Sequence, residues 1–227
     1  MSSIDPYEVS LWILPVLLAV TLHEAAHGFV AWRLGDETAY RQGRVSANPF
    51  RHIDPFGTIV LPGLLLLSHS SFLFGYAKPV PINVRNLRQP RRDSVLVAAA
   101  GPTANLLIAV ASAILLNAVS ALPDQAHEWT EGTLKRSIVL NVGLAVFNLL
   151  PIPPLDGSRV LLGLLPKRPA AIYARLFRYG LLIVLGIIVI PPLIGRNLGI
   201  DLDIIGWMMD RPVRYLLQVL APLAGLH

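Results

Sequence analysis

The chain has 227 residues, of which 54% are apolar, 15% are charged and none is cysteine. This composition excludes a soluble globular domain, and the lack of cysteine excludes disulfides, thiolate metal sites and cysteine nucleophiles. A formal net charge of +5 leaves nucleic-acid binding open until the basic residues are placed. Several apolar runs approach the roughly 20 residues that cross a bilayer, so the sequence predicts one membrane-embedded domain over residues 1–227.

Four apolar runs predict spanning helices in an all-α polytopic membrane protein. They cover about Leu11–Leu34, Ser94–Val119, Ser137–Leu150 and Ile172–Ile194. The third run is short. We expect the first to remain in the mature protein, because its N-terminal tail carries acidic residues and no small-residue cleavage site follows. The core then covers about 11–165, and C-terminal helices cover about 170–227.

A fifth apolar run, Phe56–Phe74, differs from the other four. Pro62 and Gly63 interrupt it, serines make its second half polar, and basic residues flank both ends. If it spanned, one basic cluster would lie outside, against the tendency of positive charge to face the cytoplasm. The sequence therefore predicts a re-entrant segment.

The basic residues then orient the chain. Three cytoplasmic groups hold 14 of the 19 basic residues, while most acidic residues fall in the outer segments. We expect an outer N-terminus, four spans in a bacterial cell membrane, and contacts of Arg88, Arg91 and Arg92 with lipid headgroups. Ile204–Leu226 reads as an interfacial helix or a short extra span. No folded basic domain or aromatic platform supports nucleic-acid binding.

The first run contains His23-Glu24-Ala25-Ala26-His27, the HExxH pattern. On a helix, residues four apart share a face, so both imidazoles can bind one metal ion while the glutamate handles protons. Ionisable residues are costly inside a membrane and are retained there mainly for function. The alternative is a set of hydrogen-bonded polar side chains within a helix bundle.

A catalytic zinc ion takes three protein ligands and keeps one position open. The best third ligand is Asp156, which follows the proline-rich stretch NLLPIPPLDG. These prolines must end the third helix, and irregular backbone at membrane depth suits a buried or wet site. The alternative is that Asp156 is a helix cap or a turn residue before Gly157.

Depth along the helices gives a second argument. At about 1.5 Å per residue from the predicted cytoplasmic ends, His23 and His27 lie at depths similar to those of Gly101 and Asn105. Asn148 and Asp156 bracket the same layer. The sequence therefore predicts that the polar and helix-breaking residues meet in the cytoplasmic half of the membrane.

The motifs HEAAH, GPTAN and NLLPIPPLDG, in this order, resemble the site-2 protease family of intramembrane zinc metalloproteases. The resemblance covers about Leu11–Leu165, and the segments around Asn48–Gly57 and Phe74–Asn83 are similar to a bacterial subgroup without appended domains. It implies that His23, His27 and Asp156 bind one zinc ion, that Glu24 is the general base, and that Asn148 holds substrate or stabilises the oxyanion. It also implies substrates that are membrane proteins, with anti-sigma factors and signal-peptide remnants as examples in related bacterial proteins.

Cleavage inside a membrane requires an extended substrate, which strand addition to a sheet edge can hold. Two stretches, about Ala39–Ser46 and Tyr76–Val84, predict a small β-hairpin beside the re-entrant run. We expect Asn105, Tyr76 and Lys78 to contact substrate. The alternative function is a metal-binding transporter or chaperone without hydrolysis, although the outer half of the bundle has almost no ionisable residues for transport. An inactive relative acting only as a binding partner is a third possibility.

Overall fold

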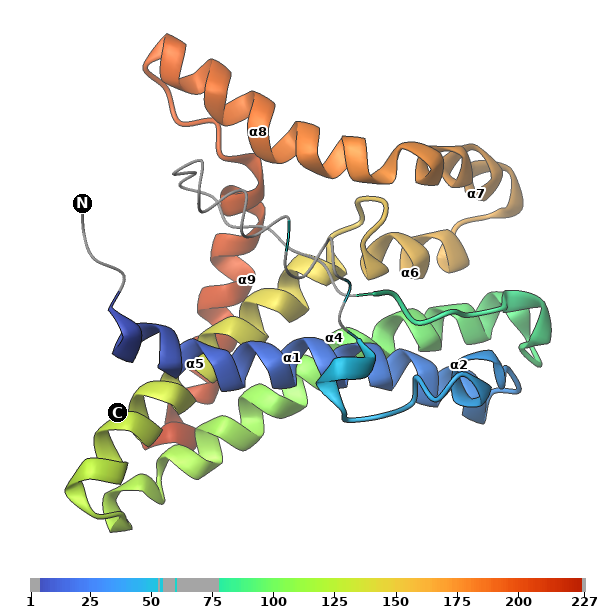
Figure 1. The fold of residues 1–227 in the computed structure, drawn as a ribbon. Helices are drawn as coiled ribbons and strands as arrows, with labels where there is room; N and C mark the ends of the chain where they lie inside the picture. The colour runs from blue at the N-terminus through green and yellow to red at the C-terminus, as the bar shows by residue number, and fades with distance from the viewer. Residues whose placement is uncertain (1–4, 53, 55–59, 61–77, 226–227) are drawn as a thin grey trace.

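A computed structural model of the chain describes residues 5–52, 54, 60 and 78–225 (Figure 1). The α-helices are α1 (Pro6–Arg33), α2 (Thr38–Arg41), α4 (Pro90–Leu116), α5 (Asp124–Leu149), α6 (Asp156–Leu164), α7 (Lys167–Ala174), α8 (Gly180–Leu198) and α9 (Ile204–Leu220). Short 3₁₀ turns are η1 (Pro49–Arg51), η3 (Val84–Asn86), η4 (Val119–Ala121), η5 (Arg175–Tyr179) and η6 (Pro222–Ala224). The described residues contain no strand, which confirms the all-helical prediction for this part of the chain.

Three segments of the described chain are long and apolar enough to cross a membrane: Pro6–Arg33, Pro90–Leu116 and Lys167–Gly195. They match three of the four predicted spans. The fourth, at 137–150, is the C-terminal half of α5, a helix of 26 residues. The N-terminal half of α5 carries five charged residues, Asp124, Glu128, Glu131, Lys135 and Arg136, and α5 is therefore not among the three candidates.

The predicted β-hairpin is not supported. Its first arm, Ala39–Ser46, begins inside α2 and continues through turns rather than a strand. Its second arm is described from Lys78 onward and is a loop that leads into η3, while residues 76 and 77 lie outside the described residues. Just before α2, the Asp36 carboxylate accepts hydrogen bonds from the backbone N–H and the hydroxyl of Thr38, a turn that leads the chain into the helix rather than into a strand. The predicted re-entrant run lies outside the described residues except for Val60.

Helices α1, α4 and α5 form the central bundle (Figure 1). Small residues of α4 pack against apolar residues of α5 in a cluster that includes Ala109, Ala113, Ile138 and Val142. Small side chains let neighbouring helix backbones approach closely, which is how helices associate when lipid removes the hydrophobic driving force.

The C-terminal helix α9 belongs to the same packing unit. Its Leu220 is buried in the α4–α5 cluster, with Val213, Leu216 and Leu217 packed against it. The sequence predicted an interfacial helix or a short span here. One side of α9 lies on α5, while Trp207, Tyr215 and Val219 are exposed, so a position of α9 at or in the membrane stays a prediction.

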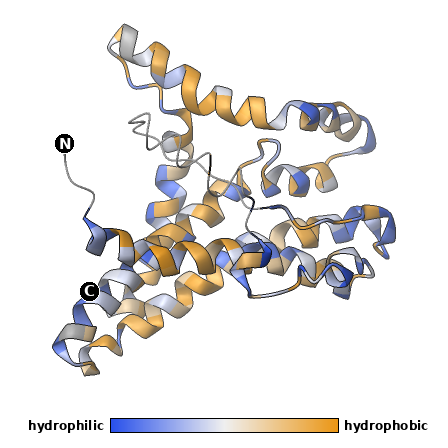
Figure 2. Ribbon diagram, in the orientation of Figure 1, coloured by the Kyte–Doolittle hydropathy of each residue, from blue (hydrophilic) through white to orange (hydrophobic). Residues whose placement is uncertain are grey.

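Helix α8 extends away from the bundle (Figure 1) and is coloured almost entirely hydrophobic in Figure 2. Many of its large apolar side chains are exposed, among them Leu182, Ile190 and Leu193. Such a face is unfavourable in water and favourable in lipid, so it agrees with a membrane-embedded helix.

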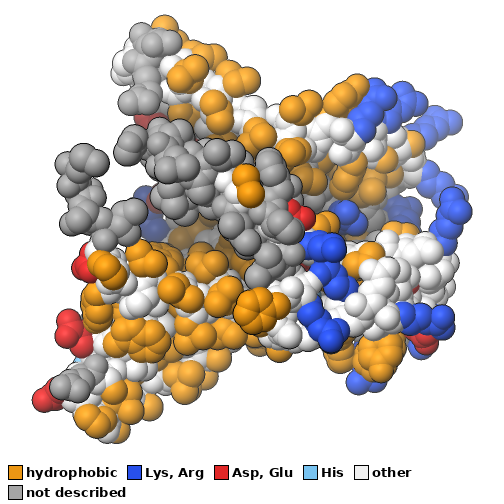
Figure 3. Space-filling model, viewed as in Figure 1, with side chains coloured by type: hydrophobic (Ala, Val, Ile, Leu, Met, Phe, Trp, Pro, Cys, Tyr) orange, Lys and Arg blue, Asp and Glu red, His pale blue; other side chains and the backbone are white. Residues whose placement is uncertain are grey.

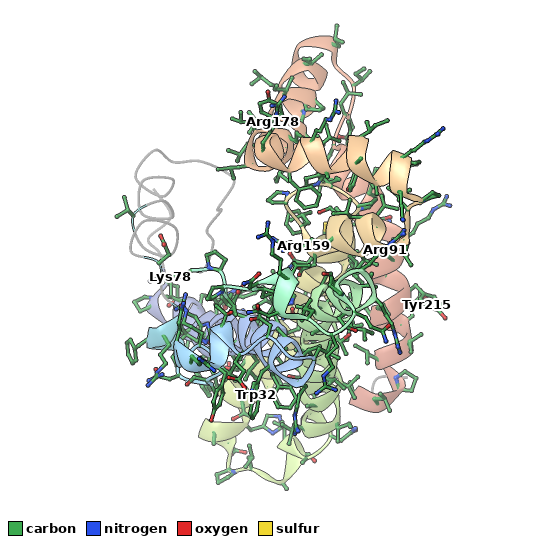
Figure 4. All side chains as sticks on the ribbon, turned by 90° about the vertical axis from the view of Figure 1, so that its right-hand side faces the viewer. Trp32, Lys78, Arg91, Arg159, Arg178 and Tyr215 are labelled. Atoms are coloured by element: carbon green, nitrogen blue, oxygen red, sulfur yellow. The ribbon has the colours of Figure 1, made fainter. Side chains whose placement is uncertain are left out.

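Charge is distributed unevenly along the long helices. Lys and Arg side chains gather at the right-hand end of the molecule in Figure 3, around α2, α7 and the beginning of α4. Figure 4 looks onto this end, where Arg91, Arg159 and Arg178 come from α4, α6 and η5. One end of the bundle is therefore strongly basic.

Candidate metal centre

Helix α1 carries both histidines in its C-terminal half, one turn apart. The His23 and His27 Nε2 atoms lie 3.1 Å from each other, and the two rings meet edge to face with centroids 4.7 Å apart. His27 is buried and His23 is partly buried. The four-residue spacing therefore aims both imidazoles at one point, as predicted.

The loop after α5 brings the third group to this point. Asp156 is the first residue of α6, and its Oδ2 atom lies 3.2 Å from His23 Nε2 and 3.3 Å from His27 Nε2. A Cβ atom on the next residue, Gly157, would lie 2.1 Å from the Leu149 carbonyl oxygen. Glycine therefore lets α6 begin directly against the end of α5, which places the carboxylate opposite the histidines.

The outer nitrogen of each imidazole is already occupied. His23 Nδ1 lies 2.6 Å from Asn105 Oδ1, and His27 Nδ1 lies 2.7 Å from the Val97 carbonyl oxygen. A carbonyl oxygen only accepts, so His27 Nδ1 carries the proton and its Nε2 presents a lone pair. Assigning the Asn105 amide with its oxygen toward His23 gives that ring the same tautomer.

Three electron-rich atoms then face one another. Asp156 Oδ2 is buried and has no hydrogen-bond partner. Two imidazole lone pairs and a carboxylate in contact repel each other unless a cation lies between them, so the donor set itself indicates a metal site.

The dimensions fit zinc. Zinc to nitrogen or oxygen distances of about 2.0–2.1 Å in a tetrahedron give ligand-to-ligand edges of about 3.3 Å. The three observed edges are 3.1, 3.2 and 3.3 Å. The backbone of α4 also closes on this point, because a Cβ on Gly101 would lie 2.4 Å from His27 Nε2 and 2.6 Å from His23 Nε2.

Glu24 stands beside the two histidines on α1. Its Oε2 accepts a hydrogen bond of 3.0 Å from the Val80 backbone N–H, in the loop between Lys78 and η3. This bond fixes one carboxylate oxygen of Glu24. Sequence reasoning missed this contact, because a backbone donor has no signature in the sequence.

The other predicted site residues lie in different environments. Asn105 is completely buried, and its hydrogen bonds are made to His23, Asn141 and Ala19. This placement suits holding His23 in position. Asn148 donates from Nδ2 to the Leu144 carbonyl oxygen of its own helix.

Lys78 is exposed, and its backbone N–H donates to the His52 carbonyl oxygen. His52 in turn lies 2.9 Å from the Ser46 carbonyl oxygen through Nε2, so it fixes the loop. Tyr76 lies outside the described residues.

Long apolar helices around a site of two histidines and a carboxylate, with an adjacent glutamate, define the class: a zinc metalloprotease with membrane-spanning helices. The profile of peptidase family M50 matches residues 118–190. The chain is 38% identical over 193 residues to "Putative zinc metalloprotease YwhC" of Bacillus subtilis, covering 83% of each chain. The chain belongs to peptidase family M50, the site-2 protease family.

Further relatives agree with this assignment. The chain is 31% identical over 194 residues to "Putative zinc metalloprotease Rip2" of Mycobacterium tuberculosis strain H37Rv, covering 86% of this chain and 71% of that protein. The chain is 32% identical over 177 residues to "Putative zinc metalloprotease Rip2" of Mycolicibacterium smegmatis, covering 78% of this chain and 66% of that protein. No solved structure matches the chain significantly.

Proposed function

We propose that this protein is an intramembrane zinc endopeptidase that hydrolyses peptide bonds in or near transmembrane segments of other membrane proteins. His23, His27 and Asp156 hold one zinc ion, and Glu24 is the general base. The site opens toward the cytoplasmic side of a bacterial cell membrane, and anionic lipids contact the basic end of the bundle.

The observation that carries this proposal is the meeting of three ligand atoms within 4.8 Å of one another. Two of them, together with the adjacent Glu24, lie on a helix long and apolar enough to span a membrane. His27 lies six residues before the last residue of α1, about 9 Å along the helix axis. The ligands are therefore deep enough to reach a bond at the end of a substrate helix and close enough to the basic end to admit water.

His23, His27 and Asp156 would hold the zinc ion, which would supply Lewis acidity for activating water and polarising the scissile carbonyl. Glu24 takes a proton from the attacking water and delivers it to the leaving amine. The Val80 N–H bond holds one Glu24 oxygen, which leaves the other to exchange protons. Asn148 and Lys78 are proposed contacts for the substrate backbone and side chains.

Replacing Glu24 with glutamine tests the proposal. The glutamine would keep the shape of the side chain and an acceptor for the Val80 N–H, but it cannot take a proton. We expect cleavage to fall by about 10²- to 10⁴-fold while zinc content stays at one per chain. Membrane-protein fragments from cells with wild-type protein or the Glu24→Gln variant are compared by mass spectrometry, and zinc is measured by atomic emission.

The matched control is Glu37→Gln. Glu37 is exposed and pairs with Arg41 one turn further along, so this change removes a carboxylate without affecting the site. Fragments should remain at the wild-type level. Equal fragment patterns in wild type and Glu24→Gln would refute the proposal, as would wild-type protein that binds no zinc.

A further inference from the structure

A chain of buried amides lies behind the metal centre, on the side away from the ligand atoms. Asn105 on α4 and Asn141 on α5 are both fully buried. Asn105 Nδ2 donates to Asn141 Oδ1 at 2.8 Å, and Asn141 Nδ2 donates to the Ser137 carbonyl oxygen at 2.9 Å. The chain of bonds therefore runs from the backbone of α5 to the His23 ring.

The Ser137 carbonyl oxygen, at the end of this series of hydrogen bonds, determines which group donates in each of them. The Ser137 carbonyl can only accept, so the NH₂ group of Asn141 faces it and the Asn141 oxygen faces Asn105. Asn105 then turns its own NH₂ group toward Asn141 and its oxygen toward His23. A second, longer bond of 3.3 Å from Asn105 Nδ2 to the Ala19 carbonyl oxygen supports the same orientation.

The orientation of the Asn105 amide decides whether the His23 nitrogen that faces the metal site carries a lone pair or a proton. With the Asn105 oxygen toward the ring, Nδ1 carries the proton and Nε2 is free to bind a cation. A flipped Asn105 amide would present a donor to Nδ1 and move the proton to Nε2, which points at His27 and Asp156. Such a ring could not act as a ligand.

We propose that Asn141 is a positioning residue for the metal centre. It touches none of the three ligands, but it orients Asn105 and thereby sets the tautomer and ring orientation of His23. The proposal rests on the proposed zinc site. Partners of this kind, one step removed from the metal, commonly contribute 10- to 100-fold to metal affinity.

A purely structural role for Asn141 is the competing explanation, because buried polar residues also join helices in membranes. The same interface provides a control for that role. Ser112 on α4 and Ser137 on α5 are buried and lie 2.8 Å apart through their hydroxyl groups. Ser112→Ala removes this link between the helices but leaves the amide chain to His23 complete.

The experiment compares zinc affinity with stability in purified full-length protein. Asn141→Leu keeps much of the side-chain volume and removes the amide. Asn141→Ala is the second variant, should the leucine not fit. Zinc affinity is measured by competition with a chromophoric chelator, the geometry by the absorption bands of bound Co²⁺, and the stability of the metal-free protein by thermal unfolding.

We expect both Asn141 variants to bind zinc about tenfold or more weakly and to shift the Co²⁺ bands, whereas Ser112→Ala should bind zinc within about twofold of wild type. Asn141→Thr should recover part of the affinity, because its hydroxyl can donate to the Ser137 carbonyl and accept from Asn105. Wild-type affinity in the Asn141 variants, or an equal loss in Ser112→Ala, would overturn the proposal. If wild-type protein itself binds no zinc, the proposed function fails instead.

Discussion

At the scale of single residues, Gly101 leaves the space that the proposed metal centre requires. The backbone of α4 passes so close to the two imidazoles that any side chain at this position would occupy the space between them. The ligand geometry therefore depends on a residue that donates nothing to the metal. The GPTAN motif reflects this, since its glycine admits the rings and its asparagine holds one of them.

We predict that Gly101→Ala abolishes high-affinity zinc binding. The new methyl group would lie 2.4 Å from His27 Nε2 and 2.6 Å from His23 Nε2, well inside contact distance. The rings must rotate away, and the three ligand atoms separate. Chelator competition measures the zinc affinity, which we expect to fall by about 100-fold, the upper end of the loss seen when the surroundings of metal ligands are changed.

Gly143→Ala is the matched control. Gly143 is also a helical glycine, on α5, but a Cβ there meets no atom within 4 Å. Alanine should leave zinc affinity unchanged and raise stability by about 0.5–1 kcal/mol through its better helix propensity. If Gly101→Ala binds zinc as tightly as Gly143→Ala, the close approach of α4 to the site is wrong.

Residue spacing predicted that His23, His27 and Asp156 come together, because HExxH on a helix and an aspartate after a proline-rich break have few arrangements. It did not predict Asn141 or the Val80 N–H. An asparagine in the apolar stretch of α5, Asn141, indicates a buried polar contact, but its partner Asn105 depends on how α4 and α5 pack. A backbone donor such as Val80 is set entirely by tertiary structure.

At the scale of elements, apolar run length predicted α1, α4 and the α7–α8 segment but not the full extent of α5. In the charged first half of α5, charges one turn apart pair with each other, as in Lys135 with Glu131, and such pairs add modest support to a helix. The hairpin prediction was wrong for Ala39–Ser46, because β-compatible composition is weak information beside the turn that Asp36 makes with Thr38.

Asp36 joins two elements that are distant in the sequence. It lies just after α1, is fully buried, and accepts hydrogen bonds from the Asn83 backbone N–H at 2.6 Å and from Asn86 Nδ2 at 3.0 Å. Two more bonds come from Thr38. The Asp36 carboxylate therefore joins the end of α1 to the segment around η3. Val80, whose N–H contacts Glu24, lies just before this segment.

We predict that Asp36→Asn lowers stability by about 1–3 kcal/mol at neutral pH. The NH₂ group of the asparagine would face the N–H and O–H donors that Asp36 now accepts from Thr38, Asn83 and Asn86. Burial raises the pKa of the Asp36 carboxyl, but the hydrogen bonds from Thr38, Asn86 and Asn83 outweigh it, so the folded pKa is lowered. The stabilisation is then complete above the unfolded pKa near 3.9 and is lost as pH falls through the lower folded value.

Thermal unfolding in detergent between pH 3 and pH 7 tests this. The difference between wild type and Asp36→Asn should be largest near neutral pH and should shrink below about pH 4. Glu37→Gln, which alters an exposed ion pair on the adjacent residue, should cost less than about 1 kcal/mol across the range. A difference that grows on acidification would contradict the assigned role of Asp36.

At the scale of the whole molecule, the separation of charge gives the bundle a direction. Basic side chains crowd one end of the long helices (Figure 3), and the metal centre lies in the half of α1 nearer that end. Positive charge is retained in cytoplasmic segments, so the basic end should face the cytoplasm. The site would then receive water and release products on that side of the membrane.

Because the chain has no cysteine, single introduced cysteines report this orientation without background. We predict that Asp124→Cys, at the exposed start of α5, reacts with a membrane-impermeant maleimide in intact spheroplasts, while Arg88→Cys, exposed just before α4, reacts only after the membrane is permeabilised. Both positions are exposed in the fold, so a difference in labelling reports the side of the membrane and not burial. Labelling of Arg88→Cys in intact spheroplasts, with Asp124→Cys protected, would reverse the orientation and place the proposed zinc site on the outer side of the membrane.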